Sequence, residues 1–258
     1  MKQKVCLITG GAGFLGRKYC EFFLKKKYVV LCVDNSKKNL KSLKSLKFAN
    51  SKNLFTYECD ITKDNKVKKL FKLINKPFLV DVLINNAAID AVPFKKKGAL
   101  QKFPTNKMWD DEINVSLKGS FFMIKFFGEE MARRKSGSII NIGSDLSVIA
   151  PNQNIYKSSY DNYIKPVTYS VIKHGMLGLT KYFASLYGKS NVRVNMVSPG
   201  PIHNNQSKKL LNELNNIIPM ERLGSPKEIL GLLLFLSSPD SSYITGQNIL
   251  IDGGRTII

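Results

Sequence analysis

A glycine-rich turn near the amino end of the chain constrains the fold most strongly. Residues 9–16 read Thr-Gly-Gly-Ala-Gly-Phe-Leu-Gly, which places the pattern Gly-x-Gly-x-x-Gly at Gly11, Gly13 and Gly16. The turn directly follows a short apolar run and opens a helical pattern. Glycine is needed there because the turn is tight and because strand and helix pack closely. The stretch therefore predicts the first strand–turn–helix unit of an α/β fold.

The same turn predicts a bound anion. The first N–H groups of the helix and the positive end of its dipole would face that anion, and the glycines let the backbone approach a diphosphate. A tight turn without any ligand is the alternative interpretation. If a dinucleotide binds, the residues of this turn expected to contact it are Gly10, Gly13, Phe14, Leu15 and Gly16.

An acidic residue stands where a dinucleotide would place its ribose. The second strand pattern ends at Asp34, 18 residues after Gly16, close to the interval of about 20 expected in dinucleotide-binding folds. A carboxylate there accepts hydrogen bonds from ribose hydroxyls and repels a 2′-phosphate, which favours NAD over NADP as the cofactor. Lys37 and Lys38 lie close enough to weaken that repulsion, so NADP stays open as the less favoured cofactor.

Strand-like and helical patterns alternate along the whole chain, which is typical of βαβ units and a parallel sheet. We expect one single-domain Rossmann fold over residues 1–258, with a doubly wound, seven-stranded parallel sheet flanked by helices. Two long connections, 88–106 and 145–166, follow strands at their carboxyl ends, where open α/β sheets bind ligands. The expected strands cover 4–9, 28–34, 54–58, 82–85, 138–142, 193–197 and 248–251, and the expected helices 14–27, 37–48, 64–74, 107–134, 167–187, 207–216 and 226–237.

The net charge of +21 raises the question of nucleic-acid binding. Of the 40 basic residues, 34 are lysines spread from end to end, and only six are arginines. Because arginine is the usual residue for bidentate phosphate and guanine recognition, this composition argues against a specific nucleic-acid surface. The positive field would instead attract an anionic small-molecule substrate.

The remaining composition points to an ordinary intracellular protein. No apolar run approaches the length of about 18 residues that a membrane span needs, so we expect a cytoplasmic protein that does not enter a membrane. The cysteines lack the close pairs of zinc or redox sites, so we expect buried, reduced thiols and no metal site. They are Cys6, Cys20, Cys32 and Cys59.

Several short motifs, taken in order, resemble those of the short-chain dehydrogenase/reductase family, and the resemblance covers nearly the whole chain. They are Cys59-Asp60-Ile61, Asn85-Asn86-Ala87-Ala88, Ile113-Asn114-Val115, Tyr169-Ser170-Val171-Ile172-Lys173, residues 193–200 and residues 245–254. The resemblance implies an NAD-dependent oxidoreductase that moves a hydride between a nicotinamide and a secondary alcohol or its carbonyl. Beyond the glycine turn and Asp34, the cofactor contacts that it implies are Asp60, Ile61, Asn86, Ala87, Ala88, Tyr169, Lys173, Pro199, Gly200 and Ile202.

One pair of residues is chemically informative without the resemblance. Tyr169 and Lys173 are four positions apart in a helical pattern, so both side chains lie on one face. Free tyrosine titrates near about pH 10, and a neighbouring ammonium favours the phenolate. Alone, such a pair would be interpreted as an ordinary helix-surface pair, but the cofactor motifs upstream make Tyr169 a candidate general acid/base.

The resemblance also assigns roles to four residues and implies an assembly. Tyr169 would exchange a proton with the substrate oxygen, and Lys173 would in addition hold the nicotinamide ribose. Ser144 would hydrogen-bond the substrate oxygen, and Asn114 would support a water-linked proton path. A homodimer or homotetramer is implied, formed through the helices 107–134 and 167–187 and the last strand.

The chain departs from the family pattern in three places, one of which is Asn204, where the family commonly has a threonine near the nicotinamide carboxamide. The glycine spacing resembles that of a longer branch that modifies sugar nucleotides, although the later motifs belong to the compact branch. Ser144 precedes Tyr169 by 25 residues, more than the family normally shows, so an insertion has lengthened the substrate loop. Rival substrate-binding hydroxyls in that loop are Ser147, Ser158 and Ser159, and residues that could form a polar, anion-tolerant entrance or only decorate the surface are Tyr156, Lys157, Tyr160, Tyr163 and Lys165.

The substrate stays open among several classes. Residues 145–169 resemble the flagellin modification protein A group of bacterial short-chain oxidoreductases, which implies a sugar or nucleotide-sugar in surface-glycan synthesis. One alternative is a reductase of 3-oxoacyl or other small carbonyl compounds that uses NADPH. Another is a catalytically silent dinucleotide-binding protein.

Overall fold

The structure is a computed structural model that describes residues 3–89, 103–159 and 163–258. Its strands form one sheet in the order β3-β2-β1-β4-β5-β6-β7, and every neighbouring pair is parallel. The doubly wound, seven-stranded sheet expected from the sequence is therefore confirmed. The strands are β1 (Val5–Thr9), β2 (Val29–Asp34), β3 (Leu54–Glu58), β4 (Val82–Asn85), β5 (Gly137–Ile142), β6 (Val192–Pro199) and β7 (Asn248–Ile251).

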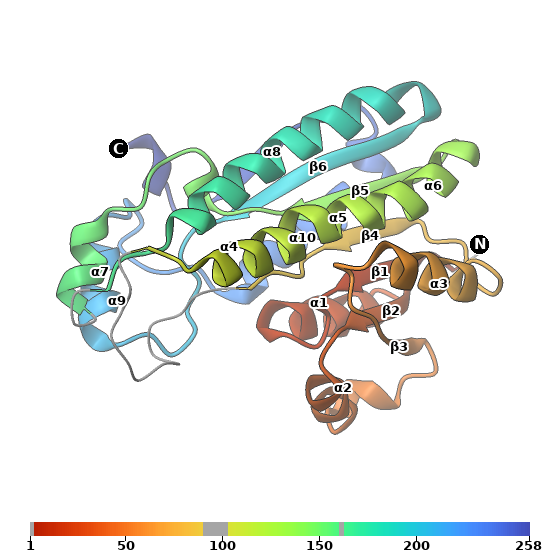
Figure 1. The fold of residues 1–258 in the computed structure, drawn as a ribbon, viewed down its shortest axis with the longest axis horizontal. Helices are drawn as coiled ribbons and strands as arrows, with labels where there is room; N and C mark the ends of the chain where they lie inside the picture. The colour runs from red at the N-terminus through yellow and green to blue at the C-terminus, as the bar shows by residue number, and fades with distance from the viewer. Residues whose placement is uncertain (1–2, 90–102, 160–162) are drawn as a thin grey trace.

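Helices cover both faces of the sheet because its inner strands are apolar on both sides. Along β1, Val5 and Leu7 join one buried cluster while Cys6 and Ile8 join the other. Figure 1 shows α8 running beside the line of α4, α5 and α6. One face carries α3 (Asp64–Ile74), α4 (Asn106–Ile113), α5 (Gly119–Met123), α6 (Glu129–Arg133) and α8 (Val167–Tyr187), and the other carries α1 (Phe14–Lys25), α2 (Lys37–Lys44) and α10 (Pro226–Leu236).

Three predicted helices need correction. The predicted helix 107–134 is interrupted by two π-helical turns, Asn114–Lys118 and Ile124–Gly128, which separate α4, α5 and α6. The predicted helix 37–48 ends at Lys44, and a 3₁₀ turn, Lys47–Asn50, follows it. The first helix ends two residues earlier than the predicted 14–27, because Lys27 has a left-handed φ of 64°.

A further helix lies inside the long connection after β5, where none was predicted. It is α7, Gln153–Ser159, and it packs on α9, Lys208–Asn215. Figure 1 shows the two together at the end of the molecule opposite the N-terminus. Ile155 of α7 is buried against Leu210 and Leu214 of α9, so this short helix is stabilised by tertiary packing that its local sequence does not reveal.

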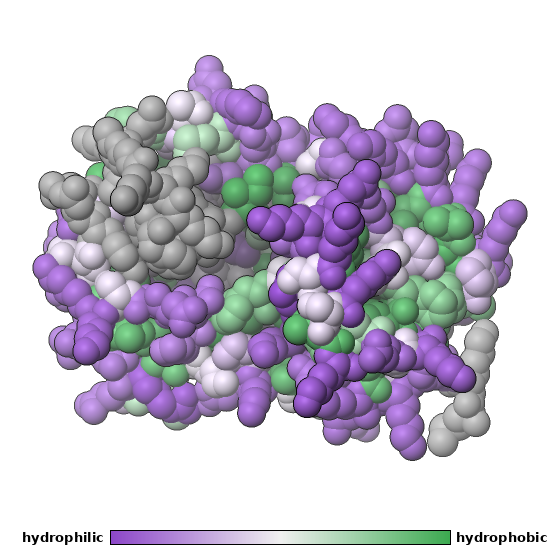
Figure 2. Space-filling model, turned by 90° about the horizontal axis from the view of Figure 1, so that it is seen from below, coloured by the Kyte–Doolittle hydropathy of each residue, from purple (hydrophilic) through white to green (hydrophobic). Residues whose placement is uncertain are grey.

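Hydrophilic residues dominate the face of the molecule that Figure 2 shows. Figure 2 shows them over most of one face, with apolar residues in smaller patches between them. Within the described ranges, no helix is both long and apolar enough to cross a membrane. All four cysteines are buried and free, as predicted, and burial raises the pKa of Cys59 to about 11.

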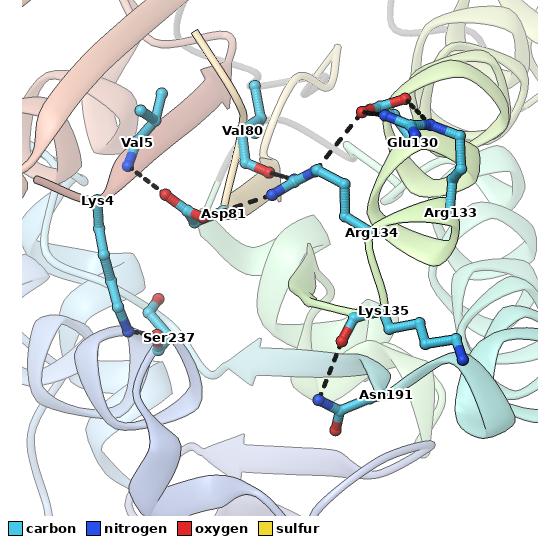
Figure 3. Close-up of polar contacts among 10 residues, drawn as sticks. All are labelled: Lys4, Val5, Val80, Asp81, Glu130, Arg133, Arg134, Lys135, Asn191 and Ser237. Carbon is cyan, nitrogen blue, oxygen red and sulfur yellow. Dashed lines mark hydrogen bonds and ion pairs between the residues drawn. The ribbon is translucent and has the colours of Figure 1, made fainter. Parts of the chain in front are cut away.

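A polar cluster closes the amino end of the sheet, opposite the carboxyl ends of the strands (Figure 3). Asp81 accepts a hydrogen bond from the backbone N–H of Val5 at 2.9 Å, which ties the start of β4 to the start of β1. Arg134 donates from Nη2 to the carbonyl of Val80 at 2.5 Å, and its Nη1 lies 3.8 Å from Asp81. Glu130 lies 3.7 Å from Nε of Arg134. The half-buried guanidinium thus joins the end of α6 to the sheet.

Replacing Arg134 with Met should destabilise the protein without affecting the opposite end of the sheet. The substitution leaves the Val80 carbonyl without its donor and removes the contact to Asp81, which costs about 1–2 kcal/mol. Thermal unfolding should show a Tm lower by a few degrees. Arg133→Met is the matched control, because that neighbouring guanidinium is exposed and, among the described residues, pairs only with Glu130 on its own helix. Equal Tm values for the two variants would contradict this assignment.

Candidate active site

The strand order places a crevice at the carboxyl ends of β1 and β4. From β1 the successive strands β2 and β3 extend in one direction across the sheet, and from β4 the strands β5, β6 and β7 extend in the other. Two adjoining cavities lie there. The larger, of about 420 Å³, is lined by residues that follow β1, β2, β3 and β4. The smaller, of about 280 Å³, is lined by residues that follow β5 and β6, by the start of α8 and by the chain's last turn. Both cavities are lined by Phe14, Leu15, Asn86, Ala88 and Asn204.

The glycine turn after β1 packs directly on the turn after β4. Gly10 has a φ of +61°, and a Cβ there would lie 2.9 Å from the Cα of Ala87. A Cβ on Gly16 would lie 2.1 Å from the carbonyl oxygen of Gly10, so the first turn of α1 cannot accept a side chain at that position. Asn86 donates from Nδ2 to the carbonyls of Thr9 and Gly10 at 3.0 and 3.1 Å. These contacts fix the turn that the sequence pattern predicted.

The N-terminus of α1 fits the diphosphate of a dinucleotide. Its N-cap residue, Gly13, offers no side chain to the first N–H groups, and the first helical turn contains no acidic residue. Gly13, Phe14 and Leu15 all line the larger cavity. Uncapped N–H groups at a helix start, facing a cavity, form a ready anion site. Gly16 lines neither cavity, and close packing explains the absence of a side chain there.

Two carboxylates lie in the larger cavity. Asp34, at the end of β2, is buried and accepts hydrogen bonds from the backbone N–H groups of Ala12 and Ser36 at 3.1 and 3.0 Å. These bonds hold the carboxylate beside the glycine turn. Asp60 accepts hydrogen bonds from the N–H and hydroxyl of Thr62 at 3.0 and 2.7 Å. Burial alone would raise the pKa of Asp60, but these bonds and nearby lysines hold that pKa below its usual value.

Three of the four predicted catalytic residues line the smaller cavity: Ser144, Tyr169 and Lys173. Lys173 is buried, and its Nζ lies 5.5 Å from the centre of the Tyr169 ring and donates to the carbonyl of Ile142 at 3.2 Å. A second ammonium, that of Lys165, lies 3.9 Å from the same ring centre. Two ammonium groups therefore lie near the Tyr169 ring, one from α8 and one from the segment that precedes α8.

The structure distinguishes among the candidate serines. Ser144 donates from Oγ to Asp145 at 2.8 Å and accepts from the N–H of Leu146 at 3.2 Å, at the wall of the smaller cavity. Ser147 instead lies 3.3 Å from the hydroxyl of Ser198 and lines neither cavity. Ser158 hydrogen-bonds Glu213, and Ser159 lines neither cavity. The geometry therefore favours Ser144 among the described serines of the loop.

The fourth predicted catalytic residue, Asn114, lines neither cavity. It opens the first π-helical turn, and its carbonyl accepts the N–H of Gly119. Its neighbour Val115 lines the larger cavity. The turn lies in the helix that packs against α8.

The remaining predicted contacts divide between the two cavities. Gly10, Asp34, Asp60, Ile61 and Ala87 line the larger one, and Pro199, Gly200 and Ile202 line the smaller one. Of the insertion residues, Tyr156, Tyr163 and Lys165 line the smaller cavity, Lys157 lines neither, and Tyr160 lies outside the described residues.

Sequence reasoning missed two charged residues of the smaller cavity, Asp145 and Arg255, which form a buried ion pair. Asp145 directly follows the predicted serine. Arg255 directly follows the turn Asp252-Gly253-Gly254 and is one of only six arginines in the chain. Its position after that turn was the one sequence signal that could have indicated a role in the site. Their pairing joins positions 110 residues apart, which spacing alone does not reveal.

Comparison with known proteins places the chain in a family. A family model described as enoyl-(acyl carrier protein) reductase matches residues 12–256. A 3-oxoacyl-[acyl-carrier-protein] reductase of Thermotoga maritima is 34% identical, covering 100% of this chain and 99% of its own length. An NAD-dependent glycerol dehydrogenase of Listeria innocua is 31% identical, covering 99% and 94%.

A solved structure agrees with these relatives. The crystal structure of a short-chain dehydrogenase from Leptospira borgpetersenii with bound NAD+ superimposes with a TM-score of 0.86. The two chains are 31% identical, and the match covers 99% of this chain and 94% of that one. Fold, site and relatives agree: this chain is an oxidoreductase that belongs to the short-chain dehydrogenase/reductase family.

Proposed function

We propose that this chain, as one catalytic domain, moves a hydride between NAD and a secondary alcohol or its carbonyl, with Tyr169 as the general acid/base. The observation that carries the proposal is that Ser144, Tyr169 and Lys173 line one cavity, which adjoins a second cavity lined by the glycine turn and Asp34. The reactants of such a transfer must meet at the boundary between a nucleotide cleft and a substrate cleft.

The side chains supply the acid–base chemistry. A bound nicotinamide dinucleotide would supply or accept the hydride. In the reducing direction, Tyr169 would give its hydroxyl proton to the substrate oxygen, and in the oxidising direction it would remove that proton. Lys173, whose Nζ lies 5.5 Å from the ring centre, would favour the phenolate and would also bind ribose hydroxyls. Ser144 would orient the substrate oxygen, and Asn114 would support the proton path from its helical turn.

The position of Asp34 supports NAD over NADP. The carboxylate is held at the end of β2, in the wall of the larger cavity, where a 2′-phosphate would meet a negative charge. Two relatives agree with this preference, since the Listeria innocua enzyme is named NAD-dependent and the Leptospira borgpetersenii structure contains NAD+.

A second candidate function is the reduction of 3-oxoacyl compounds. The name of the Thermotoga maritima relative favours it, and this relative matches the chain over its whole length. The sugar substrate implied by the flagellin modification protein A group stays a prediction, because no relative reported above is named for work on a glycan.

Other expectations remain part of this proposal. Homo-oligomers would form through α4–α6 and α8, and exposed apolar side chains on those helices, Trp109, Phe121, Tyr182 and Leu186, are consistent with such an interface. A cytoplasmic location, the lack of a specific nucleic-acid partner and of a membrane association, and an anionic substrate also stay predictions.

Tyr169→Phe should abolish turnover while the nucleotide still binds. The substitution removes only the hydroxyl that exchanges the proton, so kcat should fall by roughly 10²- to 10⁴-fold. Titration calorimetry with NADH should give an unchanged Kd. Tyr243→Phe is the control, because Tyr243 is fully exposed and lines neither cavity. Turnover by Tyr169→Phe at the rate of the unmodified chain would refute the assignment.

Asp34→Asn should narrow the preference for NADH over NADPH. Removing the negative charge ends the repulsion of a 2′-phosphate, so the ratio of kcat/KM values for the two cofactors should fall by about tenfold, roughly the effect of one unfavourable charge contact. Glu58→Gln, an exposed acidic residue at the end of the neighbouring strand, tests whether general surface charge has the same effect. A ratio unchanged in Asp34→Asn would assign cofactor choice to other residues.

A further inference from the structure

The last turn of the chain is built to insert an arginine into the substrate cavity. Gly253 and Gly254 have φ values of +65° and +88°, which reverse the chain after β7. Asp252 accepts hydrogen bonds from the N–H of Gly254 at 3.0 Å and from the N–H and hydroxyl of Thr256 at 2.9 and 2.7 Å. Arg255 lies between these two anchored residues. It is only 4% exposed and lines the smaller cavity.

The guanidinium of Arg255 is only partly used by the protein. Its Nη1 donates to Asp145 in a buried ion pair. Its Nε is buried and has no hydrogen-bond partner among the described residues. A buried donor without an acceptor destabilises the folded state, and buried polar groups normally have partners. Two parallel N–H donors of a guanidinium match the two oxygens of a carboxylate. A ligand carboxylate would therefore accept the hydrogen bond for which Nε of Arg255 has no acceptor among the described residues.

The charges around the cavity favour the same ligand. Among the described residues that line it, three carry positive charge, Lys165, Lys173 and Arg255, and one, Asp145, carries negative charge. Asp145 already accepts hydrogen bonds from Ser144 and Leu146 in addition to pairing with Arg255. The wall of the cavity is therefore positive, and a positive concave site concentrates anions.

We propose that Arg255 is a specificity-determining residue that binds a carboxylate of the substrate, so that the enzyme acts on a small oxo acid or the matching hydroxy acid. The proposal rests on the function proposed above. Asp145 links Arg255 to Ser144, so the bound carboxylate lies on the same side of the cavity as the hydroxyl that contacts the reacting oxygen. In reduction, the carbonyl carbon gains the hydride from the reduced dinucleotide and its oxygen gains the proton of Tyr169, which gives the hydroxy acid.

A matched pair of substrates tests this inference. Acetoacetate and methyl acetoacetate share the reacting carbonyl and differ in the carboxylate, so the ratio of their kcat/KM values with NADH isolates the contribution of that group. The unmodified chain should prefer the acid by about tenfold to a hundredfold, the usual effect of a hydrogen bond to a charged group. The preference should appear mainly in KM, because the carboxylate binds away from the reacting carbon.

The double variant Arg255→Met/Asp145→Asn should lose that preference. It removes both members of the buried pair, so no unpaired charge remains in the core, and the asparagine oxygen can still accept from Ser144 and Leu146. Turnover of methyl acetoacetate should change less than turnover of the acid. Arg222→Met, which breaks an exposed pair with Glu228, should keep the preference of the unmodified chain.

The outcomes separate failure of this inference from failure of the proposed reaction. The role of Arg255 is overturned if the unmodified chain reduces both compounds with equal kcat/KM, or if the double variant still prefers the acid. Either result leaves the proposed reaction intact. If neither compound is reduced, the proposed reaction fails for both of them. A binding measurement then tests whether Arg255 binds a carboxylate. Stabilisation of the NADH-loaded protein against heat by acetoacetate alone supports that role, and stabilisation by neither compound overturns it.

Discussion

Hydrogen bonds that join the end of β1 and its glycine turn to the turn after β4 hold the walls of the larger cavity together. The hydroxyl of Thr9 accepts from the N–H groups of Asn86 and Ala87 at 3.1 Å, while Asn86 donates back to the carbonyls of the glycine turn. Successive strands extend across the sheet in opposite directions from β1 and from β4, so the contact between the ends of these two strands sets the width of the crevice. A side chain at Gly10 would separate the turns, so the nucleotide cleft depends on a glycine that carries no chemistry of its own.

A second, buried chain of hydrogen bonds connects the sheet to α8. Asn85 of β4 donates to Asn141 of β5 at 2.9 Å, and Asn141 donates to Thr180 of α8 at the same distance. All three are buried, so the loss of one partner would leave polar groups unsatisfied in the core. The network fixes α8 against the sheet, and with it Tyr169 and Lys173 at the start of that helix. The positions of Tyr169 and Lys173, the proposed acid–base pair, thus depend on contacts in the core.

Most of the fold could be predicted from the sequence, because the period of apolar residues distinguishes buried strands from helices and because strands alternate with helices throughout. The predictions failed where tertiary contacts decide. Helix α7 depends on packing against α9, and the π-helical turns after Ile113 and Met123 have no signal in an uninterrupted helical pattern. Most of the lining of the larger cavity could be predicted because it follows the ends of strands, whereas the smaller cavity also takes residues from α7, α9 and the last turn.

The sequence by itself determined the order of elements, the glycine turn, the carboxylate at the end of β2 and the helical spacing of Tyr169 and Lys173, because each depends on residues that are neighbours in the chain. Only the tertiary structure decided which serine of the long loop lines the smaller cavity and that a cation from the last turn lines the same cavity. Asp145 and Arg255 are 110 residues apart, and their ion pair exists because β5 and the turn after β7 end at the same edge of the sheet. Contacts of that kind follow from the folded path of the chain, and no local pattern encodes them.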